Sequence, residues 1–240
     1  MKKFFVFMFL ALFVISSYAK DLEFTIPIDQ DDFKDLSKEL GVALQFNPMS
    51  PAEPLGITGF DVAAELVLTD IDDGKKYWKA IFSDKDPYSY IPVPRIHVQK
   101  GLPFGIDVGG MYTYVPNTNI RLWGLELKYA ILKGNMAMPA IAIRGAFSKL
   151  EGVDELDVNT QSLDLMISKG FLMLTPYAGI TALRVNTKEH SDLVDLDDEH
   201  NTIYRGFVGL QFSPFPLFVI NAEASMGTVN QYGIKIGLRF

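Results

Sequence analysis

Hydrophobic and polar side chains alternate along most of this chain, and residues 231–240 show the pattern most clearly. One face of that segment carries Tyr232, Ile234, Ile236, Leu238 and Phe240, and the other carries Gly233, Lys235, Gly237 and Arg239. Successive side chains of a strand point to opposite faces. The segment is therefore predicted to be a strand with one apolar and one polar face.

The same alternation recurs from residue 40 onward and predicts a series of strands. The segments are 40–47, 57–70, 93–100, 104–115, 121–132, 139–149, 160–170, 176–186, 203–213, 217–227 and 231–240. Residues 21–28 also alternate and supply a twelfth strand, because single-chain bacterial barrels have an even number of strands. The predicted fold is an all-β, antiparallel up-and-down transmembrane barrel of about twelve strands. The alternative is ten strands, with the N-terminus as a plug.

The connections between these segments differ in length in a regular way. With Phe240 in the periplasm, the short connections 101–103, 133–138, 171–175 and 214–216 lie on the periplasmic side, and the long ones, 71–92, 150–159 and 187–202, lie outside. Short inner turns and long outer loops are typical of outer-membrane barrels. Residues 48–56, interpreted as a further periplasmic turn, are too long to fit this pattern well.

Two short helices are also predicted. Phe33, Leu36 and Leu40 recur at helical spacing after two aspartates, which predicts an amphipathic helix over 31–40 that either plugs the barrel mouth or caps an outer loop. Residues 71–92 include Tyr77 and Trp78 and could form a second helix over the opening or at the membrane interface.

Charged residues follow the parity of the predicted strands. Those on the polar face are Glu23, Asp61, Glu65, Asp107, Glu126, Asp164, Glu223, Arg95, Lys128, Arg144, Arg184, Arg205, Lys235 and Arg239, with His97 beside them. Charges with lipid-facing parity stand only at strand ends: Asp70, Lys100, Arg121, Lys149 and Lys169. A lysine or arginine facing lipid at mid-bilayer costs about 2–4 kcal/mol, so this distribution favours a membrane barrel. The aromatic girdles are expected to include Tyr112, Tyr177 and Phe212.

The lumen is thus predicted to hold seven acids and seven bases. Two interpretations remain open. The charges either pair with one another in a structural network or form a selectivity or binding surface for a small solute. His97 is interpreted as a member of this lumen network.

The N-terminus reads as a secretory signal peptide over residues 1–19, which leaves 20–240 as a single domain. Removing Lys2 and Lys3 changes the formal net charge from −7 to −9. Nearly half of the chain is apolar, yet no mature segment approaches the ~18 consecutive apolar residues of a membrane helix. The acidic balance argues against nucleic acid as a partner. There is no cysteine, so no disulfide contributes to stability.

Two loops offer weaker candidates for chemistry. The acidic segments 150–159 and 187–202 either bind divalent cations of the lipopolysaccharide layer or are solvated acidic surface. His190 and His200 stand near Ser191, Asp192 and Asp197, which raises the hypothesis of a rim lipid hydrolase or protease. Both histidines lie in one predicted flexible loop, whereas catalytic groups need fixed mutual placement. No catalytic residue, metal site or cofactor is therefore predicted.

The signal peptide, the alternating strands and the terminal aromatic together resemble bacterial outer-membrane β-barrel proteins. Tyr232, Ile234, Leu238 and Phe240 match their C-terminal assembly signal. The resemblance implies a Gram-negative outer membrane, contact with lipid and lipopolysaccharide, and recognition by the barrel-assembly machinery. Residues 51–56 and 59–61 resemble a signature of uncharacterised porin-like barrels that carries no activity.

The leading functional prediction is a narrow pore or transporter for small solutes. The alternatives are a non-conducting structural or binding barrel with an ion-paired lumen, the rim enzyme, and a soluble secreted sandwich or lipocalin-like barrel.

Overall fold

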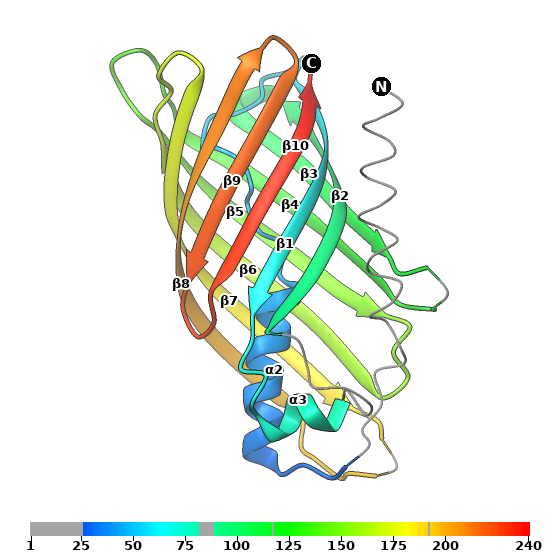
Figure 1. The fold of residues 1–240 in the computed structure, drawn as a ribbon. Coiled ribbons are helices and arrows are strands. Elements are labelled where there is room, and N and C mark those ends of the chain that lie inside the picture. Colours follow the sequence, from blue (N-terminus) through cyan, green and yellow to red (C-terminus); the bar gives the residue numbers. More distant parts are fainter. Residues whose placement is uncertain (1–25, 82–88, 117, 192) are drawn as a thin grey trace.

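The computed structural model describes residues 26–81, 89–116, 118–191 and 193–240, and its main feature is a closed β-barrel (Figure 1). The strands are β1 (Phe60–Asp70), β2 (Tyr90–Leu102), β3 (Ile106–Tyr114), β4 (Arg121–Lys133), β5 (Ala140–Glu151), β6 (Leu156–Ser168), β7 (Leu174–Glu189), β8 (Glu199–Phe215), β9 (Phe218–Met226) and β10 (Gln231–Arg239). The predicted signal peptide lies outside the described residues.

Every strand pairs antiparallel with its neighbours in sequence, and β1 closes the barrel against β10. The closing register runs from Asp61 opposite Arg239 to Thr69 opposite Gln231. Phe60 and Phe240 extend it by exchanging backbone hydrogen bonds of 2.9 and 2.8 Å. No sheet edge is left unpaired within the barrel, and this is the arrangement that strands need in lipid.

The structure confirms the ten-strand alternative and corrects the count of twelve. Residues 40–44 end a helix and 45–47 are irregular, and 26–28 are not in a strand. Both segments alternate for a different reason, since they lie inside the barrel or at its mouth, against apolar residues of the wall.

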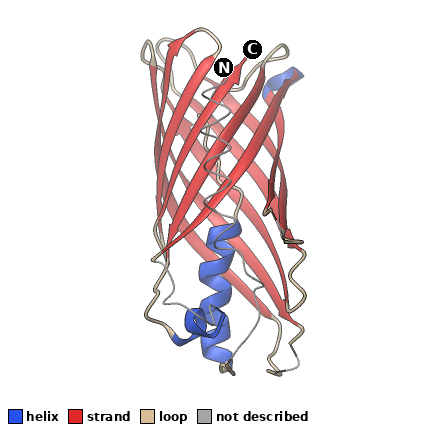
Figure 2. Cartoon of the chain, turned by 45° about the vertical axis from the view of Figure 1, so that its right-hand side comes forward, coloured by secondary structure: helices blue, strands red, loops and turns tan. Residues whose placement is uncertain are grey.

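Helix α2 (Gln30–Leu44) enters one mouth of the barrel (Figure 2). It extends beyond the predicted 31–40. The Asp29 side chain caps its first turn by accepting a hydrogen bond of 2.9 Å from the Asp32 amide. Gly41 lies against β7 so closely that a Cβ there would meet Val185 at 2.3 Å. A second helix, α3 (Lys76–Ile81), packs against α2.

From α2 the chain runs through the lumen to the opposite mouth, where β1 begins (Figures 1 and 2). We call 45–59 the plug segment, and α2 with this segment the plug. Residues 41–52 are all buried. Pro48, Pro51 and Pro54 recur every third residue and favour an extended chain without ladder hydrogen bonds. Residues 48–56 are therefore part of the plug and not a periplasmic turn.

The two ends of the barrel differ. At the turn end, where β1 starts and β10 finishes, the connections are 103–105 (the 3-10 turn η1, Pro103–Gly105), 134–139, 169–173 and 216–217. At the loop end, which holds α2 and α3, they include 71–89 and 190–198. The outer loops predicted at 150–159 and 187–202 are shorter than expected, because β6, β7 and β8 continue into them.

The outer wall is predominantly apolar along its middle. Exposed outward side chains there include Leu125, Leu127, Leu163, Leu165, Ile180, Val208 and Ile234. Within the described residues, no helix is long and apolar enough to cross a bilayer.

The interior has three layers. At the loop end, α2 and α3 contribute Phe33, Leu36 and Trp78 to an apolar cluster with Leu183 and Ile203 of the wall. A smaller cluster toward the turn end contains Ala52, Met166 and Phe207. Buried charged and amide side chains, such as Glu65, Glu126 and Arg144, make up the third part of the interior.

Candidate functional site: the charged lumen and its plug

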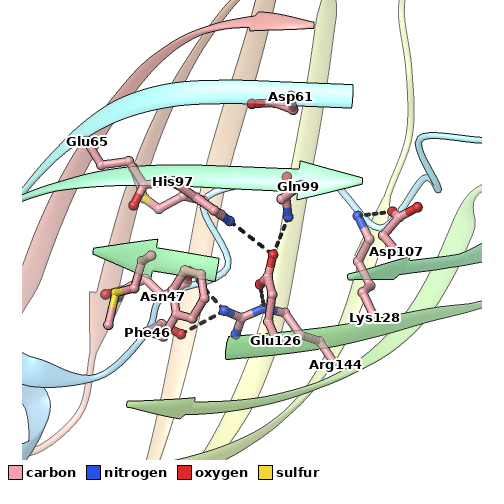
Figure 3. A network of polar contacts seen from close by, with 12 residues as sticks. Phe46, Asn47, Asp61, Glu65, His97, Gln99, Asp107, Glu126, Lys128 and Arg144 are labelled. Carbon is pink, nitrogen blue, oxygen red and sulfur yellow. Dashed lines mark hydrogen bonds and ion pairs between the residues drawn. The ribbon is translucent and has the colours of Figure 1, made fainter. Parts of the chain in front are cut away.

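A chain of buried ion pairs crosses the middle of the lumen (Figure 3). Arg95 Nε on β2 lies 3.1 Å from Glu65 on β1, and Arg144 on β5 pairs through Nε with Glu126 on β4. Arg144 also donates from Nη1 to Asp164 at 2.6 Å. All five side chains are at most 1% exposed. Such pairs must be nearly complete, because an unpaired buried charge is strongly destabilising.

His97 joins the two halves of this chain. Its Nδ1 lies 2.5 Å from Glu65 and its Nε2 lies 3.0 Å from Glu126. The ring therefore bridges the carboxylates of two different ion pairs, Glu65 on β1 and Glu126 on β4. The ring also meets Phe46 of the plug edge-on, with centroids 4.8 Å apart.

The two arginines of this chain of ion pairs, Arg95 and Arg144, also bind the backbone of the plug segment. Arg144 Nη2 donates to the carbonyls of Phe46 at 2.9 Å and Asn47 at 3.2 Å, and its guanidinium lies over the Phe46 ring (Figure 3). Arg95 donates to the Gln45 carbonyl at 2.8 Å and to the Asn47 side chain at 2.6 Å. An extended segment that pairs with no β-strand needs such donors, because a buried carbonyl without a hydrogen bond is costly.

Further wall side chains hold the rest of the plug segment. Toward the turn end, Lys128 donates to the Pro51 carbonyl at 3.0 Å and pairs with Asp107 at 3.1 Å. Asp107 in turn accepts from the Leu55 amide at 3.1 Å. On the other side of the lumen, Glu223 accepts from the Met49 amide at 3.0 Å.

Amide and hydroxyl groups continue these contacts into α2. Gln231 donates to the Val42 carbonyl at 2.8 Å and accepts from Gln45 and Asn47. Ser148 donates to the Leu44 carbonyl at 2.8 Å. The last carbonyls of a helix have no intrahelical partner, so these wall groups satisfy the end of α2.

A second charged group lies at the turn end. Asp61 accepts from Arg239 at 2.8 Å and stands 3.4 Å from Lys235. Beside it is a pocket of about 110 Å³, lined by Ser50, Pro51, Glu53, Pro54, Leu55, Gln99, Lys128 and Arg239. Its lining includes both wall and plug, so the pocket exists only while the plug is in place.

Eleven of the twelve residues proposed from sequence for the lumen do face it, and Arg184 is the exception. Arg205 is buried near the loop end, where it donates to the Val229 carbonyl at 2.9 Å and to Ser225. Within the described chain, neither Arg205 nor Glu223 forms an ion pair.

The outward position of Arg184 has a clear physical cause. In β7 the inward residues include Tyr177, Leu183 and Val185, which pack in the two apolar layers. If the apolar residues of β7 are assumed to face lipid, the inner and outer faces of this strand are therefore exchanged. Tyr177 consequently lies inside, next to Phe207, and not in a girdle.

The structure also reveals lumen residues that the sequence reading missed: Gln45, Phe46 and Asn47. Their alternation predicts a strand, whereas these residues lie in the plug segment. The prolines at three-residue spacing that follow them were the available signal for an extended, unpaired segment.

The loop histidines do not converge on a common centre. His190 lies 3.1 Å from Asp157, with both side chains about half exposed, and His200 contacts Asn186 at 2.8 Å. Asp192 lies outside the described residues. Among the described residues, no group of three or more His, Cys, Asp or Glu side chains is arranged to hold a metal ion.

No protein-family model matches the chain, and no curated protein matches it significantly. The solved structures it resembles include the N-terminal β-barrel domain of Pseudomonas aeruginosa OprF, at 14% identity and a TM-score of 0.38 over 77% of this chain and 99% of that one. KdgM porin is 10% identical, with a TM-score of 0.39 over 75% of this chain and 99% of its own. Yersinia pestis Ail is 17% identical, with a TM-score of 0.35 over 78% and 99%.

These similarities are too low to indicate a shared ligand or activity. The closed sheet of the chain itself, with an apolar exterior and a polar lumen, gives it the architecture of a bacterial outer-membrane β-barrel.

Proposed function

We propose that this protein is an outer-membrane barrel whose lumen is closed by its own N-terminal segment, so that it conducts no solutes in its resting state. The observation that carries the proposal is the use made of the lumen charges. Arg95, Arg144 and Lys128 each combine an ion pair to the wall with hydrogen bonds to the plug. The charges that would line a pore bind protein instead of solute.

The same geometry gives an orientation. Short turns on one side and longer loops on the other support a turn end that faces the periplasm. The C-terminal strand presents Tyr232, Ile234, Leu238 and Phe240 on the outer surface of the barrel wall. The barrel-assembly machinery could bind them there during insertion. Export through a signal peptide cleaved near Ala19 belongs to the same proposal.

A narrow pore or transporter is the second candidate, and it requires the plug to leave. Displacement would break the bonds of Arg95, Arg144 and Lys128 to the plug and expose the apolar face of α2. The pocket at the turn end is the one observation that favours this candidate, because it gives a small solute a polar entry site beside the plug.

Conductance of the purified full-length protein in planar bilayers tests the proposal. We expect no steady channel from the wild type over the usual voltage range. A variant with weakened plug contacts, Arg95→Met with Arg144→Met, should show openings, while the outward-facing Arg184→Met should remain silent. A stable open channel in the wild type would refute the closed lumen.

A further inference from the structure

The four connections at the turn end carry large apolar side chains at their tips. Met136 and Leu172 are fully exposed, Phe104 is 84% exposed and Leu217 is 52% exposed. Each belongs to a different turn, so exposed apolar tips occur all around this rim. They add nothing to the core of the barrel.

Three of the tip residues also adopt a backbone conformation that favours glycine. Phe104, Leu172 and Leu217 have φ of 67°, 52° and 72°. Pro216–Leu217 joins the paired Phe215 and Phe218, which is the pattern of a type II turn with glycine expected at its second central position.

Leu172 takes the first central position of a two-residue hairpin, where glycine is also preferred. Bulky residues at positive φ are strained. Their side chains are more than half exposed, so packing within the protein offsets little of that strain.

The charge of the rim differs from that of the opposite end. In the four connections 103–105, 134–139, 169–173 and 216–217 the only charged residue is Lys169, and Lys133 ends β4 beside the second of them. Lys169 caps the exposed turn of Met136 by donating to the carbonyls of Asn135 and Met136, each at 2.8 Å. The loop end instead carries many acids, namely Asp72, Asp73, Asp154, Glu155, Asp195, Asp197 and Asp198.

We propose that the turn end is inserted into a phospholipid leaflet, with the four turn tips at the boundary between head groups and acyl chains. Apolar side chains beside Lys133 fit this boundary, because this lysine can reach lipid phosphates while the tips enter the acyl region. The rim is also continuous with outward apolar residues of the wall, such as Ile131 and Leu132. A ring around the whole barrel suits lipid, whereas a protein partner would cover one side. The inference rests on the proposed membrane location.

Single-cysteine labelling tests this directly, because the chain has no cysteine. Met136→Cys and Leu172→Cys would carry a nitroxide in vesicles of phosphatidylethanolamine and phosphatidylglycerol. Collision with oxygen is compared with collision with a water-soluble nickel chelate. The outward wall variant Leu163→Cys is the lipid control, and the exposed loop variant Asp154→Cys is the water control.

We expect the labels at 136 and 172 to favour oxygen over the chelate, closer to the label at 163 than to the one at 154. Labels at 136 and 172 that match the one at 154, with 163 still in lipid, would overturn the insertion of the rim and leave the barrel in the membrane. A water-exposed label at 163 would overturn the membrane location as well.

Glycine variants supply a second measurement. Leu172→Gly with Leu217→Gly removes two of the four apolar tips and relieves the backbone strain at both positions, so the barrel should fold in detergent as well as the wild type. Its folding into vesicles should be several-fold slower. Equal rates in vesicles would also count against the proposal.

Discussion

Replacing Arg144 by methionine should destabilise the barrel and loosen its plug. The methionine keeps an unbranched side chain but loses the bonds to Glu126, Asp164 and the carbonyls of Phe46 and Asn47. Removing one partner of a buried ion pair typically costs ~3–5 kcal/mol, because the other charge stays buried. Glu126 keeps His97 and Asp164 keeps Thr181, which places the expected loss toward the lower end.

The loss is measurable as a lower unfolding temperature. One kcal/mol corresponds to about 2–4 °C in a domain of roughly this size, so a loss of ~3 kcal/mol should lower the unfolding temperature by about 6–12 °C. Folded and unfolded barrels are separated by gel mobility after heating to graded temperatures in detergent. The same preparation, placed in planar bilayers, should show brief openings.

Arg184→Met is the matched control, since Arg184 lies on the outer face of β7. Its stability should stay within ~0.5 kcal/mol of the wild type. Adding Asp164→Asn to Arg144→Met removes one unpaired carboxylate and should recover part of the loss. If the Arg144 and Arg184 variants unfold at the same temperature, the buried network does not hold the plug in place.

Two further predictions concern the loop end. Gly41→Leu should prevent α2 from packing against Val185, because a Cβ alone at this position would meet Val185 at 2.3 Å. The N-terminal segment should then be cleaved by protease. Lys34→Leu, at an exposed position of the same helix, should leave the segment resistant. Glu39 accepts from Tyr77 at 2.9 Å and from Trp78 at 2.6 Å. Burial and the hydrogen bond to Glu39 raise the pKa of the Tyr77 hydroxyl. The stability that the neutral hydroxyl contributes is therefore fully present below about pH 10, the ordinary pKa of tyrosine. It is lost as the pH rises through the raised pKa of the folded protein. Alkaline titration should therefore red-shift Trp78 fluorescence later than free tyrosine ionises, and an unchanged signal after Glu39→Gln would contradict the role of this carboxylate.

The sequence predicts the wall of this barrel well. Ten of the predicted segments overlap the ten strands, because each strand has lipid on one side and a polar lumen on the other. That environment imposes alternation directly on the residues, as in β10, where Ile234 faces out and Lys235 faces in. The lumen position of most charges follows from the same rule.

The interior could not be predicted in the same way. Where the lumen is filled by protein, the inner face of the wall is partly apolar. The alternation of apolar and polar residues then no longer distinguishes the inner face from the outer one. For this reason it predicts the wrong faces for Leu183 and Arg184 of β7. The plug residues Phe46 and Asn47 bind partners that are 48 to 184 positions away in sequence. No local pattern encodes such contacts, although the prolines of the plug segment indicate an unpaired extended chain.

The balance of wall charges leads to a prediction about any open state. The inner wall carries six acids and six bases beside His97: Asp61, Glu65, Asp107, Glu126, Asp164, Glu223, Arg95, Lys128, Arg144, Arg205, Lys235 and Arg239. In the closed state several of these groups bind the plug, so they must become hydrated as the plug leaves. The open lumen would then be water-filled and close to neutral, and neutral wide paths discriminate weakly between ions.

Openings of Arg144→Met should therefore pass potassium and chloride at similar rates, with a shift toward potassium because one base has been removed. Adding Asp164→Asn restores the balance between acids and bases in the lumen. The reversal potential measured in a salt gradient should then move back toward the equilibrium potential of chloride. A strong preference for either ion in the single variant, unchanged in the double, would show that the current follows a path other than this lumen.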